Sequence, residues 1–223
     1  MAGMNNINHL LNKGGFCFLD FIKTLSVVYY NLHLMFTKIN SAAVVGLECI
    51  HIAVEVDIAG SWPGFQIVGL PDTAIQEAKE RIRTAWKNTS LTFPSNSRVV
   101  INLAPADVRK EGSAFDLPMA VGMFIASESL KIDTKDAMFV GELALDGTLR
   151  HINGALPLAI FARDHGYKQL FVPGINAREA SLIREIDVYA VDTFEQIVKH
   201  ITGVSPLTKK DPPAIEDWFE TTE

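Results

Sequence analysis

From Ser41 onward, the chain alternates two kinds of hydrophobic pattern: apolar residues at every second position, which is typical of strands, and apolar residues three or four positions apart, which is typical of helices. The clearest strand covers Ile50–Ile58, where an aliphatic face alternates with a face that carries His51, Glu55 and Asp57. The short run Val44–Glu48 precedes it. We expect these two runs to form a pair of strands.

The pattern continues in the same way up to residue 203. Strands are expected at residues 65–70, 98–103, 137–145, 148–152, 168–173 and 187–191. Helices are expected at residues 73–88, 115–129, 154–165, 176–183 and 193–202. The pair Asp146-Gly147 predicts a hairpin turn between two of the strands. Hairpins followed by alternating strands and helices favour one α+β domain over residues 35–203.

Side chains that can accept hydrogen bonds from a first helical turn mark the predicted helix starts. Three pairs have capping-box spacing: Thr73 with Gln76, Asn176 with Glu179, and Thr193 with Gln196. Asp116 is expected to cap the helix that begins at Phe115, and Pro118 fits only in its first turn. Trp86 is expected in the core, since large aromatic side chains are usually buried.

Residues 1–34 differ from the rest, because a polar start runs into a stretch rich in aromatic and aliphatic residues. Asp20 and Lys23 interrupt that stretch, and the uncharged run Thr24–Phe36 is shorter than the roughly 20 residues that a spanning helix needs. The segment also lacks the basic start and cleavage site of a signal peptide. We expect no stable membrane insertion. Two interpretations stay open: an upstream extension of the reading frame outside the fold, or an amphipathic arm weakly attached to a membrane.

Residues 204–223 form a second distinct segment, rich in proline and acidic residues. Ser205-Pro206 and Pro212-Pro213 prevent a continued helix, and the charged residues make a solvated linker the expected structure. Trp218 and Phe219 are unusual on a free tail. They predict either a docking anchor or the start of a further domain.

Composition and charge exclude several classes of protein. With 20 Lys and Arg against 26 Asp and Glu, the 223-residue chain has a formal charge of −6, which excludes a nucleic-acid-binding domain driven by bulk positive charge. Apolar residues make up 48% of the chain, enough for an ordinary core. Cys17 and Cys49 are too few for a disulfide framework and lie outside metal-ligand spacing, so a cytoplasmic location is expected.

Three long motifs identify a family: PGFQIVGLPDTAIQEAKERIRTA, VINLAPADVRKEGSAFDLPMAVG and FVGELALDGTLRHINGALPLAIFA. Over residues 35–203, the chain resembles the N-terminal, Lon-protease-like "ChlI" domain of the magnesium-chelatase-like AAA+ ATPases of the YifB and ComM group. The resemblance implies an α+β fold similar to domain 2 of ribosomal protein S5, with a mixed sheet and packed helices. It also implies that residues 204–223 lead to an ATPase module, so that the chain is truncated before it.

Lon peptidases use a serine nucleophile and a lysine base, and the resemblance places both positions in this chain. Where those enzymes read GPSAG, this chain reads GSAFD at residues 112–116, with Ala114 at the nucleophile position. Where they read GGLK, this chain reads NGAL at residues 153–156, with Leu156 at the lysine position. Ser113 is displaced by one residue from the nucleophile position. No catalytic residues are therefore expected.

Within the family motifs, a structural role is expected for Pro71, Asp72, Gly112, Asp116, Pro118, Gly141, Glu142 and Gly154. Nearby basic residues are candidates for contacts with a substrate or with DNA: Arg109, Lys110, Arg81, Arg83 and Lys87. A turn and a helix cap also explain the segment around Arg109 without a ligand. For the helical residues, the alternative is a solvated face that Glu77 and Glu80 dilute.

Other kinds of site lack their sequence signatures. The histidines are scattered without metal-ligand spacing, so no metal site is expected. His200, in the last helix, is expected to suit the helix dipole as a cation. The chain contains no GxxxxGKS or GxxxxGKT segment, so no nucleotide-binding residues are expected, and ATP and Mg²⁺ are expected only in the ATPase module.

The leading interpretation is a non-catalytic accessory or assembly domain of a YifB/ComM-like ATPase, with the AAA+ module supplied in cis or in trans. The resemblance implies that the complete protein binds and hydrolyses ATP, forms a homo-oligomeric ring, expected to be a hexamer, and acts on DNA in competence or recombination. Any DNA contact of this acidic domain is expected to be local and salt-sensitive.

Two alternatives stay open. A cryptic Lon-like serine peptidase would lose peptide turnover when Ser113 is substituted. A free-standing interaction module, docking through its tail on a separately encoded ATPase, would lose co-purification with that ATPase when residues 204–223 are deleted.

Overall fold

The computed structural model describes residues 36–46, 48–60 and 62–213. The chain there begins with a long hairpin of β1 (Phe36–Val45) and β2 (Glu48–Ala59), which pair antiparallel from Phe36 opposite Asp57 to Val45 opposite Glu48. The strand expected at Val44–Glu48 is therefore wrong, because that run contains the hairpin turn, where Gly46 has a φ of 64°. The strand expected at Ile50–Ile58 lies within β2, and it pairs with the strand before it, which is β1 and not the predicted run Val44–Glu48.

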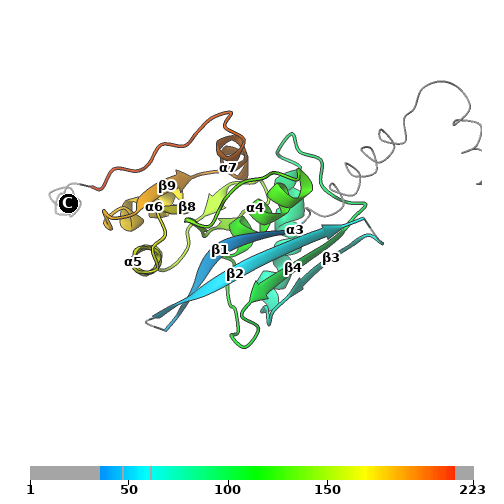
Figure 1. Cartoon of the computed structure of the whole chain (residues 1–223), viewed down its shortest axis with the longest axis horizontal. Helices are drawn as coiled ribbons and strands as arrows, with labels where there is room; N and C mark the ends of the chain where they lie inside the picture. Colours follow the sequence, from blue (N-terminus) through cyan, green and yellow to red (C-terminus); the bar gives the residue numbers. More distant parts are fainter. Residues whose placement is uncertain (1–35, 47, 61, 214–223) are drawn as a thin grey trace, which may run out of the picture. The chain divides into compact units, whose positions relative to one another are not determined.

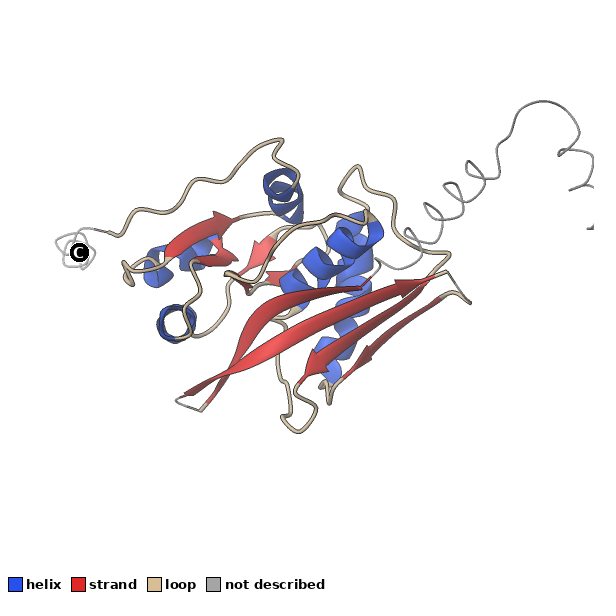
Figure 2. Cartoon of the chain, in the orientation of Figure 1, coloured by secondary structure: helices blue, strands red, loops and turns tan. Residues whose placement is uncertain are grey.

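One mixed sheet of seven strands forms the centre of the fold (Figures 1 and 2), in the order β3-β4-β2-β1-β5-β8-β9. Its other members are β3 (Gly64–Val68), β4 (Arg98–Ala104), β5 (Ala137–Phe139), β8 (Gln169–Pro173) and β9 (Asp187–Val191). The pairs β1/β2 and β2/β4 are antiparallel, whereas the other four neighbouring pairs are parallel. The α+β class with a mixed sheet is confirmed, in agreement with the S5-like fold that the resemblance implied.

The strand expected over residues 137–145 is split in two. The chain leaves the main sheet after β5, because Gly141 bonds with the β4–α4 region instead. The N–H of Gly141 donates to the carbonyl of Ala114, and the carbonyl of Gly141 accepts the N–H of Leu117. It then forms a separate hairpin of β6 (Glu142–Leu143) and β7 (Leu149–Arg150). The Asp146-Gly147 turn predicted between them is confirmed, with Gly147 at a φ of 87°.

Helices cover both faces of the sheet and create two hydrophobic cores. The first core lies under α3 (Thr73–Trp86), α4 (Asp116–Ser127) and α7 (Phe194–Ile201), and it contains the fully buried Trp86. The second lies under α5 (Ala155–Asp164) and α6 (Gly174–Ala180). Helix α4 is buried over almost its whole length, because it packs between the sheet on one side and α3 and α7 on the other. No helix within the described ranges has the length and apolarity needed to cross a bilayer.

The helix starts differ from expectation at three of four caps. Asp72, and not Thr73, caps α3 by accepting the N–H of Ile75 at 2.8 Å. Helix α4 begins without a side-chain cap, because the Asp116 carboxylate accepts hydrogen bonds from Arg81 and from the N–H of Leu143 instead. Asn176 is buried within α6, where its amide bonds both the N–H and the carbonyl of Ile152. The capping box that begins at Thr193 is confirmed.

The segment that follows α7 is partly docked on the fold. The N–H of Lys210 donates to the carbonyl of Val188 at 2.7 Å, and the Lys209 ammonium pairs with Asp187 at 3.2 Å. Leu207 packs against the first core. Residues 204–206 and 208–210 are exposed, as expected for a solvated linker. The segment nevertheless contacts the fold, and Lys209 forms one isolated antiparallel bridge with Tyr189 of the edge strand β9. Residues 1–34, Trp218 and Phe219 lie outside the described residues.

His200 joins this docked segment to α7. Its Nδ1 accepts the N–H of Leu207 at 3.0 Å, and its ring contacts both members of the stacked pair Phe171 and Tyr189. Burial lowers the pKa of His200. The expected cation at the helix end is therefore wrong, since an Nδ1 that accepts a hydrogen bond must be unprotonated.

Gly69 occupies a position where the backbone of β4 leaves no room for a side chain. Its φ is 96°, and a Cβ there would lie 2.2 Å from the carbonyl oxygen of Leu103. We expect Gly69→Ala to lower the free energy of unfolding by at least about 2 kcal/mol, since both the backbone conformation and the contact are strained. Gly60 is a matched control, because a Cβ there meets nothing within 4 Å. Urea unfolding monitored by tryptophan fluorescence measures both, and equal stability of the two variants would contradict the expectation.

Candidate functional site

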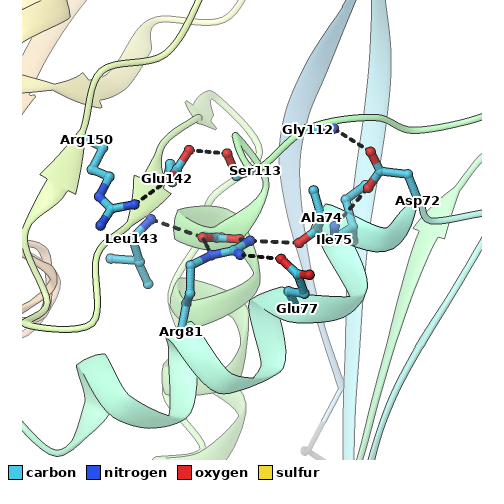
Figure 3. A network of polar contacts seen from close by, with 11 residues as sticks. Asp72, Ala74, Ile75, Glu77, Arg81, Gly112, Ser113, Glu142, Leu143 and Arg150 are labelled. Atoms are coloured by element: carbon cyan, nitrogen blue, oxygen red, sulfur yellow. Dashed lines mark hydrogen bonds and ion pairs between the residues drawn. The ribbon is translucent and has the colours of Figure 1, made fainter.

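The family motifs meet where three connections come together: the β3–α3 loop, the β4–α4 loop and the turn between β5 and β6 (Figure 3). Asp72 joins the first two connections. Its Oδ1 caps α3, and its Oδ2 accepts the N–H of Gly112 at 2.9 Å. Pro71 also forms an isolated parallel bridge with Lys110. The expected structural role of these motif residues therefore has a specific form, which is to fix one loop against another.

Lys110 lies inside this junction. Its side chain is fully buried, and its Nζ donates to the carbonyl of Gly69 at 2.9 Å and to the carbonyl of Pro105. Burial lowers the pKa of the Lys110 ammonium. Its proposed contact with a substrate or DNA is therefore wrong in this conformation, because the group that would bind a phosphate already serves two backbone carbonyls of the loops.

Arg81 and Asp116 form a buried ion pair between α3 and α4 (Figure 3). The Arg81 guanidinium donates to both Asp116 oxygens, at 2.6 and 3.0 Å, and to the carbonyl of Ala74 at 2.8 Å. Asp116 is 0% exposed and also accepts the N–H of Leu143 at 3.1 Å. The expectation that Arg81 faces solvent is wrong, since only 15% of its side chain is exposed.

Burial of the Asp116 carboxyl raises its pKa to about 6, because removal from water disfavours the charged form more than Arg81 and the Leu143 N–H favour it. The hydrogen bond to Asp116 in turn raises the pKa of Arg81. At neutral pH both groups are charged, and the pair holds α3, α4 and the β6–β7 hairpin together.

A cleft of about 230 Å³ opens beside this pair, between the end of β1, the β4–α4 loop and the segment after β7. The Ser113 hydroxyl on its wall donates to Glu142 (Figure 3). Glu142 also pairs with the opposite residue of its hairpin, Arg150, at 3.1 Å. Ser113 therefore has an acceptor that is itself engaged with a cation, and not a free general base.

The two positions aligned with the Lon dyad lie at and near this cleft. Ala114 lines the cleft, and its carbonyl accepts the N–H of Gly141 at 2.8 Å. The backbone N–H of Leu156 donates to Glu179 at 3.0 Å. None of the described residues that line the cleft is a lysine. Across the part of the chain that the structure describes, no three His, Cys, Asp or Glu side chains gather as metal ligands would.

The remaining motif residues also shape the backbone here. Pro118 is the third residue of α4, so it stands in the first turn as predicted. Gly141 is buried at the point where the chain leaves the main sheet. Gly154 is the N-cap residue just before α5 and has a φ of 80°, a conformation that favours glycine.

The other candidate basic residues are exposed and do not gather at this cleft. Arg109 is 74% exposed and pairs with Glu111. Arg83 is 45% exposed and pairs with Glu80, and Lys87 follows directly after the end of α3. These three stay candidates for surface contacts, whereas Arg81 and Lys110 serve the interior.

Sequence reasoning missed the Arg81–Asp116 pair and the burial of Lys110. The apolar residues that surround Asp116 in FDLP were a usable signal, since a carboxylate in such a run needs a cation when buried. For Lys110 the local sequence offers no comparable signal, because its partners are backbone carbonyls brought by the loops.

Removal of the arginine should destabilise the fold strongly. We expect Arg81→Ala to lower the free energy of unfolding by about 3–5 kcal/mol, because it leaves the buried Asp116 carboxyl without the cation and the hydrogen bonds that compensate its charge. Arg83→Ala is the matched control on the same helix, with an expected loss of about 1 kcal/mol or less, since its pair is exposed. Chemical denaturation measures both changes. Similar losses in the two variants would contradict the structural role of the buried pair.

The stability should also report the titration of Asp116. Its folded pKa, about 6, lies above the unfolded value of 3.8, so the folded state binds the proton more tightly. The stabilisation that results from the protonation of Asp116 is fully present below about pH 4 and is lost as the pH rises through about 6. We expect the stability of the wild type relative to Asp116→Asn to fall over this range, measured by urea titrations at several pH values. A relative stability that rises with pH would reverse the sign and contradict the assignment.

Comparison with known proteins relates this junction to one family. The family model described as "Subunit ChlI of Mg-chelatase" matches residues 54–176, which include every structural motif residue named above. Competence protein ComM of Haemophilus influenzae is 39% identical over 168 residues, which cover 75% of this chain and 33% of ComM. Uncharacterized protein YifB of Salmonella typhimurium is 37% identical over 185 residues, which cover 82% of this chain and 36% of YifB.

A more distant similarity connects the chain with a peptidase. Lon protease 2 of Bacillus subtilis is 32% identical over 126 residues, which cover 55% of this chain and 22% of that protein. The chain spans about a third of the length of the ComM and YifB relatives. Since the family model covers more than half of the chain and its motif residues form the junction of loops, this protein belongs to the magnesium-chelatase subunit ChlI family, together with ComM and YifB.

Proposed function

We propose that this chain is a non-catalytic accessory or assembly domain that works with a magnesium-chelatase-like AAA+ ATPase module. The observation that carries the proposal is the engagement of Ser113: its hydroxyl donates to Glu142, which is held by Arg150. The aligned dyad positions hold Ala114 and Leu156, neither of which can act as nucleophile or base. The motif residues instead fix loops and helices, which suits a rigid part of a larger assembly.

The activity of the whole protein is part of the same proposal. ATP and Mg²⁺ bind the AAA+ module, which is joined to this domain in cis or docks on it in trans. The module assembles a homo-oligomeric ring, a hexamer, in the cytoplasm and acts on DNA. The name of the Haemophilus influenzae relative, a competence protein, supports a role in competence. With a net charge of −6, this domain makes only local and salt-sensitive contacts with DNA, with Arg83, Lys87 and Arg109 as the exposed candidates.

A chimera tests the accessory role. The third of Haemophilus influenzae ComM that matches this chain is first deleted and then replaced by residues 36–203 of this chain. We expect the deletion to abolish ATP-dependent assembly and the replacement to restore it, because the loop junction presents the same rigid surface. Sedimentation with and without ATP, together with ATP turnover, measures the outcome. An assembly that is unaffected by the deletion would contradict the proposal.

The matched control separates assembly from peptidase chemistry, the alternative that the similarity to Lon protease 2 favours. A chimera with Ser113→Ala should assemble and turn over ATP as the unsubstituted chimera does, since the hydroxyl has only a structural partner. Peptide turnover by the isolated chain that Ser113→Ala abolishes would instead establish the peptidase.

A further inference from the structure

A second hollow lies on the other side of α3 from the Arg81–Asp116 pair, at the edge of the sheet. It is a groove of about 430 Å³ between the start of β3, the second half of α3 and residues 93–97, and we refer to it as the edge groove. Strand β3 is the outermost strand on this side of the sheet, next to β4 and with α3 close by (Figure 1). The family-motif junction described above contributes none of the residues that line it.

The floor of the edge groove is aromatic and held in place from below. Phe65 and Phe93 line it, with ring centroids 6.5 Å apart. Phe93 packs edge-on against the fully buried Trp86, with centroids 5.8 Å apart. Because Trp86 is fixed in the core, the two partly exposed phenylalanines form an apolar floor that is held in place.

The rim of the edge groove is positive. The Arg83 guanidinium lies over the Phe93 ring, 5.6 Å from its centroid, and Lys87 lines the groove one helical turn further on. None of the described residues that line the groove is acidic. Arg83 does pair with Glu80 at 3.2 Å, but that glutamate is 71% exposed, so the pair is weak and Arg83 can exchange it for another anion.

A different hollow on the same protein shows that this charge pattern is local. The hollow around Asp133, Lys135, Asp136, Lys168 and Asp187 balances its two lysines with three carboxylates. On a chain with a formal charge of −6, an aromatic groove with two cations and no lining carboxylate is an exception. Its charge is complementary to an anion that also carries a planar apolar group.

Nucleic acid has both of these groups, and the form that fits is a single strand. A base stacks on an aromatic platform through its face, which a duplex hides between neighbouring base pairs. Trp62, which is 91% exposed, adjoins the groove residue Pro63 and offers a second platform for the next base along the strand. We infer that the edge groove binds single-stranded nucleic acid, with a base against Phe65 and against the Arg83 guanidinium that lies over Phe93. The flanking phosphates lie at the N–H groups of Arg83 and at Lys87.

This inference deepens the nucleic-acid contact in the proposed function. It rests on the proposed function only for the source of the strand, because the groove itself supplies the chemistry. It selects Arg83 and Lys87 among the exposed candidates and leaves Arg109 out, since Arg109 does not line the groove.

Fluorescence anisotropy with a labelled oligothymidine of about 12 nucleotides tests the inference on the 223-residue chain. The double variant Arg83→Gln/Lys87→Gln should bind at least about tenfold more weakly and lower the slope of log affinity against log salt by about 1.4, for two phosphates at about 0.7 each. Trp62→Ala should weaken binding roughly fivefold or more through lost stacking. All three side chains are exposed, so the free energy of unfolding of each variant should lie within about 1 kcal/mol of the wild type.

The matched control is Lys135→Gln/Lys168→Gln, which removes the same charge from exposed ion pairs in the other hollow and should leave binding unchanged. An equal loss of affinity in this control would show that the oligonucleotide responds to the total charge of the protein, and it would contradict binding in the edge groove. Equal affinity for a duplex of the same length would contradict the stacking of a base in the groove. If the protein binds an acidic aromatic peptide but no oligonucleotide, the ligand of the groove is a protein and the inference is wrong.

Two further comparisons complete the test. Oligouridine in place of oligothymidine distinguishes RNA from DNA as the source of the strand, and tighter binding of either by the wild type than by the Arg83/Lys87 double variant supports the groove. If no oligonucleotide binds and the chimera with ComM still assembles, the inference fails while the accessory function stands.

Discussion

The buried ion pair between Arg81 and Asp116 is the interaction on which the arrangement of this domain depends. A charged carboxylate with no exposed surface is stable only with a partner, and Arg81 supplies two hydrogen bonds to it. The same carboxylate accepts the N–H of Leu143 at the start of the small hairpin. Two helices and one hairpin, from three separate stretches of sequence, are thus fixed by one pair of side chains.

The loops of the family motifs extend this arrangement. Asp72 caps α3 and also receives the N–H of Gly112, while Lys110 donates to two carbonyls inside the same junction. These polar side chains replace the backbone partners that irregular loops lack. Structure therefore explains several polar positions of the long motifs that the chain shares with its family. The Ser113 hydroxyl, next to the position that corresponds to the Lon nucleophile, donates to Glu142.

The mixed sheet separates the domain into two halves with different surfaces. The parallel half, β5, β8 and β9, is covered on both faces, since each face has its own hydrophobic core. The half that contains the long antiparallel hairpin ends in the edge strand β3, and there the covering helix α3 leaves the edge groove open beside it. At the opposite edge, the docked segment after α7 contacts β9 through one bridge and one backbone hydrogen bond. The two edges of one sheet therefore differ in what they offer to a ligand.

The sequence alone was enough to predict the family, the helices, most of the strands, the Asp146-Gly147 turn and the Thr193 capping box, because periodic patterns and caps act over a few neighbouring residues. It could not predict which of the charged side chains are buried. Arg81 and Asp116 are 35 residues apart, and Lys110 meets a carbonyl 41 residues away. Only the tertiary structure decided that these residues are buried and that Arg83 stays at the surface, because the exposure of a side chain depends on which distant segments pack over it.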